Sequence, residues 1–85
     1  MTIRMVYFAW VRERVGVAEE LVDPPATATT VAALVDWLAA ESDRHAAAFA
    51  DRGRLRAAVD QDFVAMEASI AGAREVALFP PVTGG

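Results

Sequence analysis

The sequence of 85 residues contains no cysteine and no lysine, and its eight basic residues other than histidine are all arginines. Without cysteine there can be no disulfide bond, thiolate nucleophile or thiolate metal ligand. Without lysine there is no side-chain amine to form a Schiff base, and no phosphate-binding loop that ends in Gly-Lys-Ser/Thr. Neither a thiol nor an amine side chain can therefore supply chemistry in this chain.

Long apolar runs and positive charge are also scarce. Runs such as 76–79 fall far short of the roughly 18–20 apolar residues that cross a bilayer, and Glu13 and Arg14 stand where a signal peptide would have its small-residue cleavage site. The net charge of −4 and the isoelectric point of about 4.7 disfavour binding to a phosphate backbone. We therefore expect a cytoplasmic protein with no membrane partner and no nucleic-acid partner.

The composition indicates a single folded domain. Hydrophobic residues make up 55% of the chain and charged residues 24%, which is outside the range of disordered chains. A domain of this length buries at most about two-thirds of its unfolded surface. We therefore do not expect a deep active-site cavity in this chain.

The first quarter of the sequence predicts two strands. Residues 2–10 are rich in β-branched and aromatic types and are predicted to form the first strand. A turn or helical segment at 11–16 leads to a second strand at 19–22, which Asp23-Pro24-Pro25 ends. The period of two assigns residues to two faces of the first strand: Ile3, Met5, Tyr7 and Ala9 on one face, and Arg4, Val6, Phe8 and Trp10 on the other.

Two helices are predicted in the middle of the chain. Thr29 or Thr30 can cap the first of them, which carries an apolar stripe. Ser42 can cap a shorter, alanine-rich helix at 43–50, which Phe49 would anchor to the core. The stripe of the first helix has the spacing i, i+3, i+4, i+7 and consists of Val31, Leu34, Val35 and Leu38.

The last part of the chain predicts three strands. The segment 55–59 alternates and is followed by the turn Asp60-Gln61 and a short returning strand at 63–66. The final strand at 75–79 places Val76 and Leu78 opposite Glu75, Ala77 and Phe79, and the Pro80-Pro81 pair ends it.

The order of these elements predicts an α+β fold. One mixed sheet would pack on one main helix, with a short second helix inserted before the third strand, and the crossover through the main helix permits a parallel strand pair. This layout fits a β-grasp, ubiquitin-like fold. We expect residues 1–79 to form the β-grasp domain and residues 80–85 to form a flexible C-terminal tail that ends in Gly-Gly.

The tail sequence points to chemistry at its carboxyl end. Gly-Gly at a chosen dipeptide has a probability of roughly 0.5%, from about 7% glycine per position. Two residues without Cβ atoms fit a narrow cleft and leave the carbonyl carbon of Gly85 uncrowded. The ionised α-carboxylate can attack a nucleotide α-phosphate to form an acyl-adenylate. Because the chain has no phosphate-binding loop of its own, a partner must bind the nucleotide.

Three segments together resemble the small subunit of molybdopterin synthase, a family of sulfur carriers. The C-terminal run 76–85 reads Val-Ala-Leu-Phe-Pro-Pro-Val-Thr-Gly-Gly, and 7–13 reads Tyr-Phe-Ala-Trp-Val-Arg-Glu. The turn at 58–61 reads Ala-Val-Asp-Gln, where the family usually has Val-Asn-Gln. Asp60 therefore departs from the common asparagine, and the resemblance otherwise covers nearly the whole chain.

The resemblance implies a reaction cycle at Gly85. An E1-like enzyme that uses ATP with magnesium would adenylate Gly85, a sulfurtransferase would supply sulfur, and Gly85 would become a thiocarboxylate. The tail residues Pro81, Val82, Thr83 and Gly84 would then enter the large subunit of a heterotetrameric synthase. There the sulfur would form the dithiolene of molybdopterin, with catalytic residues from the large subunit. This chain itself would bind no cofactor and no metal.

Two other functions share this terminal chemistry. The chain could be a ubiquitin-like sulfur carrier for thiazole, cysteine or tRNA thiolation, or a protein modifier that forms an amide through Gly85. The longer body with its inserted helix and the Phe-Pro-Pro-Val-Thr run favour the pterin pathway. An interaction module without covalent chemistry is a third class, for which a blocked C-terminus would change nothing.

The predicted partner surface is the sheet face turned away from the main helix. Arg4 and Glu75 mark this face as the wetter one, but it also carries Phe8, Phe63 and Phe79, with Pro80 next to them. Exposed aromatic residues are enriched at protein contacts. In contrast, we expect His45 to be a surface residue of the second helix. The arginines at 52, 54 and 56 could pair with an acidic partner or a nucleotide phosphate, but a solvated strand edge is the favoured interpretation.

Overall fold

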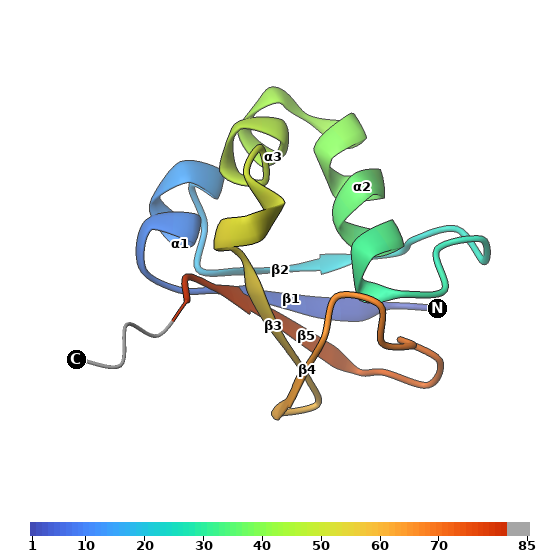
Figure 1. Ribbon diagram of the computed structural model, residues 1–85. Helices are drawn as coiled ribbons and strands as arrows, with labels where there is room; N and C mark the ends of the chain where they lie inside the picture. Colours follow the sequence, from blue (N-terminus) through green and yellow to red (C-terminus); the bar gives the residue numbers. More distant parts are fainter. Residues whose placement is uncertain (82–85) are drawn as a thin grey trace.

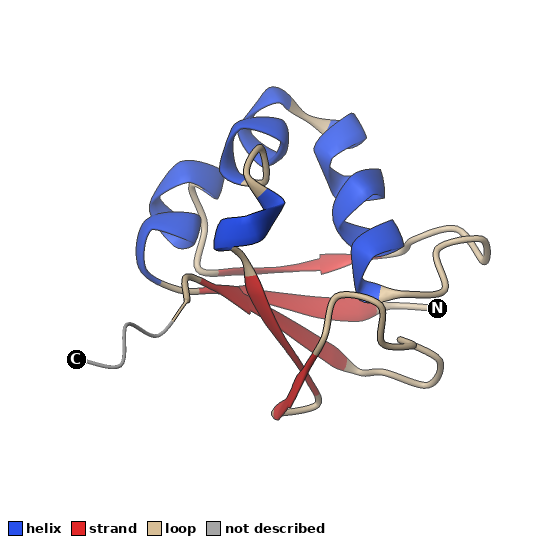
Figure 2. Cartoon of the chain, viewed as in Figure 1, coloured by secondary structure: helices blue, strands red, loops and turns tan. Residues whose placement is uncertain are grey.

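The computed structural model describes residues 1–81, which form a sheet with helices on one face. The five strands have the order β2-β1-β5-β3-β4 (Figure 1). Three α-helices lie on one face of the sheet, and within residues 1–81 no helix covers the other face (Figure 2). In chain order the elements are β1 (Ile3–Tyr7), α1 (Ala9–Val15), β2 (Glu19–Val22), α2 (Val31–Glu41), α3 (Asp43–Ala48), the 3₁₀ helix η1 (Arg52–Arg54), β3 (Arg56–Val59), β4 (Asp62–Val64) and β5 (Glu75–Phe79).

The sheet is mixed, as the element order predicts. β1 pairs with β2 and β3 pairs with both β4 and β5 in antiparallel fashion, whereas β1 and β5 are parallel. A parallel pair needs a crossover connection, and the helical segments between β1 and β5 provide it. The β-grasp, ubiquitin-like architecture predicted from the sequence is therefore confirmed.

The hydrophobic core lies between the sheet and the helices. Alternate residues of β1 and β5 face the helices, so that Met5 and Tyr7 pair in register with Val76 and Leu78, and all four are at most 1% exposed. Burial of one such side chain stabilises the fold by roughly 1.5–3 kcal/mol. The apolar stripe of α2 packs on them and is equally buried, as predicted: Val31, Leu34, Val35 and Leu38.

Side-chain caps begin the two helices at the predicted residues. The Thr30 hydroxyl accepts a hydrogen bond from the Ala33 amide at 3.1 Å, and the Ser42 hydroxyl accepts one from the His45 amide at 3.1 Å. Such caps satisfy amide groups that have no partner within the helix. Thr30, rather than Thr29, is the cap of α2, and Phe49 is fully buried beside α3.

The first strand is shorter than the sequence predicts. Residues 2–10 alternate like a strand, but β1 ends at Tyr7, Phe8 becomes the N-cap of α1, and Ala9 has a φ of 52°. The chain therefore turns sharply at Ala9, and Trp10 packs partly buried on the core instead of lying on the open face. The predicted turn or helical segment at 11–16 is a helix, α1, so three α-helices cover the sheet. None of the helices in residues 1–81 is long and apolar enough to span a membrane.

Candidate functional site: the open face and the end of β5

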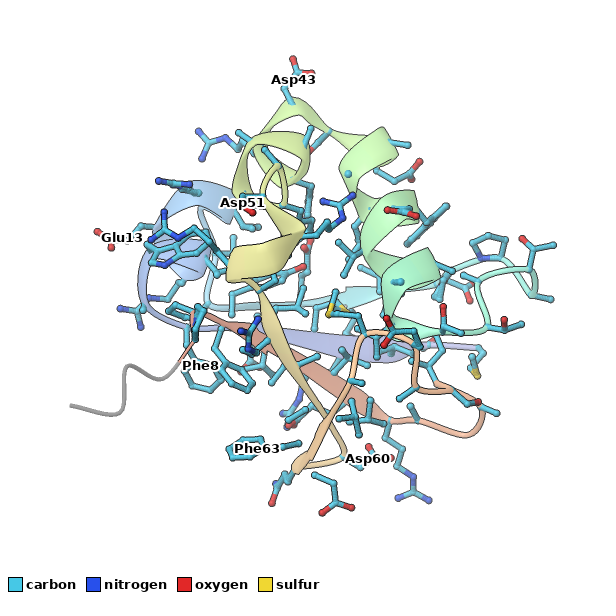
Figure 3. All side chains as sticks on the ribbon, viewed as in Figure 1. Phe8, Glu13, Asp43, Asp51, Asp60 and Phe63 are labelled. Carbon is cyan, nitrogen blue, oxygen red and sulfur yellow. The ribbon has the colours of Figure 1, made fainter. Side chains whose placement is uncertain are left out.

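The open face of the sheet carries a groove with aromatic walls. Phe8 and Phe63 are 49% and 80% exposed, and the rings of Phe63 and Phe79 have their centroids 5.6 Å apart. Figure 3 shows Phe8 and Phe63 below the sheet, on the side opposite the helices. The groove has a volume of about 390 Å³. The structure thus brings together the three phenylalanines that strand parity assigns to this face.

Strand register explains the shape of the groove. On the open face Phe63 lies opposite Ala58, and Ala58 lies opposite Ala77. These two alanines are buried and line the groove, together with the three phenylalanines. Small residues at the centre and large residues around them leave a hollow that an apolar side chain of a partner can fill.

An ion pair lies at the far end of the same face. Arg4 of β1 and Glu75 of β5 are direct neighbours in register, and the Arg4 guanidinium donates a hydrogen bond to Glu75. That hydrogen bond and the charges of Glu75 and Glu19 raise the pKa of the Arg4 side chain. The open face therefore has a charged end at the start of β5 and an aromatic end where β5 finishes.

The chain leaves the sheet at the aromatic end. The Phe8 amide donates to the Leu78 carbonyl at 3.2 Å, and Phe79 is the register partner of Arg56. Pro80 and Pro81 are half-buried and directly follow β5. The end of β5 lies beside α1 and the start of β3 (Figure 1). Pro80, predicted as an interface residue, does not line the groove. The predicted tail residues Val82, Thr83, Gly84 and Gly85 lie outside the described part of the chain.

Asp60 fixes the turn between β3 and β4 to the start of β5. Asp60 and Gln61 have φ values of 49° and 74°, which are the positive values of a type I′ hairpin turn. The Asp60 side chain accepts hydrogen bonds from the amides of Arg74 and Glu75, both at 3.0 Å. The oxygen of an asparagine side chain could accept the same two bonds. The departure from asparagine therefore leaves this contact intact.

His45 is not a simple surface residue, which corrects the sequence interpretation. Its side chain is only 14% exposed, its Nε2 lies 2.6 Å from Glu20, and its Nδ1 lies 2.5 Å from the Ser42 hydroxyl. The buried Tyr7 hydroxyl donates to the same Glu20 oxygen at 2.7 Å. Burial and this hydrogen bond raise the pKa of Tyr7. The network joins β1, β2 and α3 on the covered side of the sheet, away from the groove.

Two arginines also lie outside their predicted position. Arg52 and Arg54 belong to η1 and not to a strand edge, and Arg52 forms an ion pair with Asp36 of α2 at 2.8 Å. Of the three arginines at 52, 54 and 56, only Arg56 belongs to β3. Within residues 1–81, no three histidine or carboxylate side chains converge in a way that could hold a metal ion.

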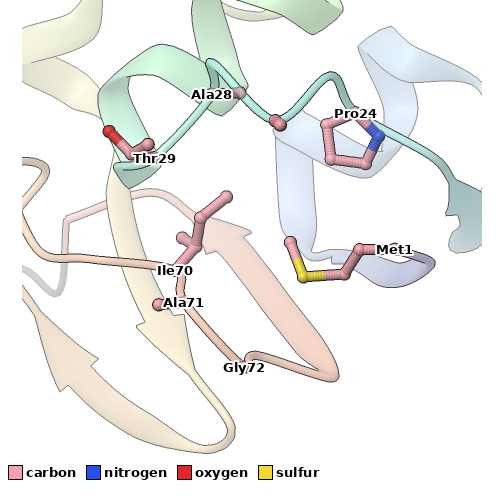
Figure 4. Close-up of a pocket in the computed structure, with 8 residues that line it drawn as sticks. Met1, Pro24, Ala28, Thr29, Ile70, Ala71 and Gly72 are labelled. Atoms are coloured by element: carbon pink, nitrogen blue, oxygen red, sulfur yellow. The ribbon is translucent and has the colours of Figure 1, made fainter.

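A second hollow lies at the other end of the molecule, near the N-terminus. Its volume is about 380 Å³, and its lining is mainly small and apolar (Figure 4). The lining contains no acidic, basic or imidazole side chain, and the α-amino group of Met1 is paired with Asp23 at 2.9 Å. The residues around it are Met1, Pro24, Ala26, Ala28, Thr29, Ile70, Ala71 and Gly72.

Comparisons with known proteins agree with the resemblance seen in the sequence. The ThiS family matches residues 5–85. The molybdopterin synthase sulfur carrier subunit of Escherichia coli K12 is 46% identical over 83 residues, with 98% of this chain and 99% of the relative covered. The subunit of the same name from Haemophilus influenzae Rd is 38% identical over 84 residues, with 98% and 99% covered.

A solved structure has the same fold over its full length. SAMP1 from Haloferax volcanii has a TM-score of 0.71 and 26% sequence identity, and the match covers 100% of both chains. The chain therefore belongs to the ThiS family, together with the molybdopterin synthase sulfur carrier subunits that it resembles over nearly its whole length.

Proposed function

We propose that this chain is the small, sulfur-carrying subunit of a molybdopterin synthase and that it carries sulfur on the carboxyl group of Gly85. The observation that carries this proposal is the near full-length similarity to sulfur carrier subunits, at 46% and 38% identity. The sequence also ends in the Gly-Gly pair that this chemistry needs. The chain contains no cysteine, so its sulfur must be held by a group other than a thiol side chain.

The proposed loading reaction takes place on a partner. The Gly85 carboxylate attacks the α-phosphate of ATP on an E1-like enzyme, pyrophosphate leaves, and an acyl-adenylate forms. Sulfide supplied through a sulfurtransferase then attacks the acyl carbon and displaces AMP, which leaves a thiocarboxylate at Gly85. Because the chain has no phosphate-binding loop and no lysine, the ATP and magnesium belong to the activating partner and not to a site on this chain.

The proposed transfer reaction takes place in the large subunit. The thiocarboxylate sulfur attacks a carbon of the pterin precursor and displaces an oxygen leaving group, which gives a thioester. Water then cleaves the bond between the sulfur and the Gly85 acyl carbon, so that the sulfur stays on the pterin and Gly85 returns to a carboxylate. Two rounds supply the two sulfur atoms of the dithiolene. The large subunit contributes the catalytic residues, while this chain contributes the nucleophile and its placement. In this scheme Pro80 and Pro81 direct Val82, Thr83 and Gly84 into the large subunit, since proline restricts the backbone at the end of β5.

The large subunit is proposed to dock on the aromatic groove. The groove lies next to the end of β5, so a protein seated there is also close to the start of the tail. Phe63, which is 80% exposed, has little reason to be aromatic for the stability of this chain alone. Buried aromatic anchors supply much of the affinity at many protein interfaces. We further propose a cytoplasmic location, where these partners would meet the chain.

Mass spectrometry tests the loading step. The protein, incubated with a cognate activating enzyme, ATP and a sulfur donor, should gain the mass of one sulfur in place of one oxygen, localised to Gly85. A variant with one alanine added after Gly85 is the matched control and should stay unmodified. A wild-type tail that remains unmodified, while a known carrier is loaded under the same conditions, would contradict the proposal.

A deletion of Gly85 tests the transfer step. The shortened protein should still bind the large subunit, because the groove is unchanged, but conversion of the pterin precursor should fall to background. Full conversion by the shortened protein would exclude a role for Gly85. If the wild type instead forms amide adducts with other proteins in cell extract, the function is that of a protein modifier.

A further inference from the structure

Four arginines lie on adjoining elements, and one of them, Arg56, borders the aromatic groove. The protein has a net charge of −4, yet Arg14, Arg44, Arg54 and Arg56 gather over α1, α3, η1 and the start of β3. Among residues 1–81, none of these four forms an ion pair with a carboxylate, whereas Arg4 and Arg52 do. We refer to these four residues as the arginine band.

The contacts of the four arginines link them to adjoining elements of the fold. The guanidinium carbons of Arg14 and Arg54 lie 4.7 and 5.3 Å from the centroid of the Trp10 ring system. The Arg44 guanidinium lies over Gly16, at the end of α1. Arg56 donates hydrogen bonds to the carbonyls of Gly53 and Leu55, at 3.0 and 2.9 Å.

The band is continuous with the proposed docking face. Arg56 lines a hollow of about 280 Å³ together with Phe63 and Phe79, which also line the aromatic groove. Arg56 is moreover the register partner of Phe79, the last residue of β5. A protein that covers the groove and reaches the tail would therefore meet the band at its edge.

Trp10 restricts the side chains of two of the arginines, Arg14 and Arg54, which favours their binding to a negatively charged partner. A guanidinium that lies on an indole ring is held by the cation–π attraction and loses less freedom when it binds. Its planar edge remains available for a bidentate contact with a carboxylate. Two positive groups next to one ring also repel each other, and an anion between or beside them would relieve that repulsion.

The surroundings favour a protein surface over a nucleic acid. Glu13 of α1 and Asp51, the N-cap of η1, are exposed on the same elements as the band (Figure 3). These carboxylates and the net charge of −4 would repel an extended phosphate backbone. A mixed but mainly positive rim beside an apolar groove is instead typical of a protein interface, which has an apolar centre and a polar rim.

We propose that the arginine band docks against carboxylates on the large subunit, around the opening that receives the tail, and that the Trp10-stacked pair Arg14 and Arg54 is its anchor. This inference rests on the proposed function, because it assigns the charge of the surface that meets the large subunit. Charges at the rim of an interface act mainly on the rate of association. The band would thus steer the large subunit onto the groove.

Association kinetics with the cognate large subunit test the band. The double variant Arg14→Glu/Arg54→Glu should lower the association rate constant by about tenfold or more at low salt, and the difference should shrink as salt screens the charges. The dissociation rate should change less. Arg54→Lys keeps the charge but loses the planar fork, so it should fall between the wild type and Arg54→Glu.

Arg74→Glu is the matched control for Arg54→Glu. Arg74 is exposed just before β5, beside Asp60 and Glu75 at the charged end of the sheet. Its substitution by glutamate changes the charge by the same amount as Arg54→Glu, but outside the band. At about 0.15 M salt it should leave the association rate within about twofold of the wild type, because charges more than about 8 Å away are largely screened there, and at low salt its effect should be smaller than that of Arg54→Glu. Melting curves should confirm that each variant folds, and Arg54→Gln replaces Arg54→Glu if that variant does not.

The outcomes separate this inference from the proposed function. If the wild type binds and converts the precursor, but the band variants associate as fast as the wild type, the inference is wrong and the proposed function stands. If the wild type neither binds the large subunit nor converts the precursor, both are wrong. Binding of a labelled single-stranded oligonucleotide by the wild type, lost in the double variant, would assign the band to nucleic acid and overturn the inference.

Discussion

The two faces of the sheet use the same strands for different purposes. On β5, Val76 and Leu78 face the helices and are fully buried, while Phe79 faces the open side beside the 80% exposed Phe63. An open face without a partner needs no large aromatic residues for folding, because such rings gain little while they remain in water. The contrast supports the proposal that covered residues determine stability, whereas the open-face aromatics serve binding.

The largest expected effect concerns the covered face. Leu78→Ala removes a fully buried side chain between the sheet and the helices and should leave a cavity. The free energy of unfolding should fall by about 2–5 kcal/mol, measured by urea denaturation. The affinity of the folded fraction for the large subunit should stay close to that of the wild type. A stability loss below about 1 kcal/mol would mean that this face is less tightly packed than the structure indicates.

The open face should show the opposite pattern. Phe63→Ala should change the free energy of unfolding by less than about 0.5 kcal/mol, because the side chain is 80% exposed. The dissociation constant for the large subunit should rise about 10- to 100-fold, as expected for an aromatic anchor. Calorimetric titration measures this change.

Two variants complete that experiment. Phe79→Asp places a charge beside Phe63 on the groove and should weaken binding at least as much, with circular dichroism and melting to confirm folding. Leu21→Ala is the matched control, because Leu21 is 71% exposed on β2, away from the residues that line the groove. Equal binding by the wild type and both phenylalanine variants would remove the groove from the interface.

The Asp60 turn is a third case, for which we expect a moderate effect on stability. Asp60→Ala removes the acceptor for the amides of Arg74 and Glu75 and should cost about 1–2 kcal/mol of stability. Asp60→Asn keeps an acceptor at the same position and should stay within about 0.5 kcal/mol of the wild type. Thermal and urea unfolding measure both. If asparagine is as harmful as alanine, the negative charge, and not the hydrogen-bond geometry, holds the start of β5.

Local patterns in the sequence predicted much of this contrast. The stripe of α2, the caps Thr30 and Ser42, and the parity of β5 follow from neighbours within a few residues, and the sequence alone places Phe79 and Phe63 on one face. The fold class followed from element order and from the resemblance at the tail. In each case the information lies within a short segment of the chain.

The errors concern contacts between distant segments. The alternation of residues 8–10 looks like a continued strand, and the turn at Ala9 depends on how α1 packs under α3 and β5. His45 contacts Glu20, which is 25 residues away in sequence, so no local spacing reveals that pair. One signal was present: the parity of the first strand buries Tyr7, and a buried hydroxyl group needs a partner.

The smallest expected effect tests how the covered face accommodates that hydroxyl. Tyr7→Phe removes the hydrogen bond to Glu20 and should lower the free energy of unfolding by about 1 kcal/mol at pH 7. Because burial raises the pKa of Tyr7 above its ordinary value of 10.0, folding favours the protonated hydroxyl. The resulting stability is complete below about pH 10 and is lost as the pH rises above it, by up to about 1.4 kcal/mol per pH unit.

The composition makes this measurement unusually specific. The chain has one tyrosine, no cysteine and no lysine, and arginine stays charged in this range, so Tyr7 is the one side chain expected to titrate between pH 9 and about 11.5. Urea unfolding across that range should show a steep loss for the wild type and a flat profile for Tyr7→Phe. The two curves should meet at about pH 10.7 and then cross, so that the wild type is the less stable protein, by about 1 kcal/mol, near pH 11.5. A wild-type profile as flat as that of the variant would mean that Tyr7 ionises without opposition from the fold, and that the covered face is open to water at β1.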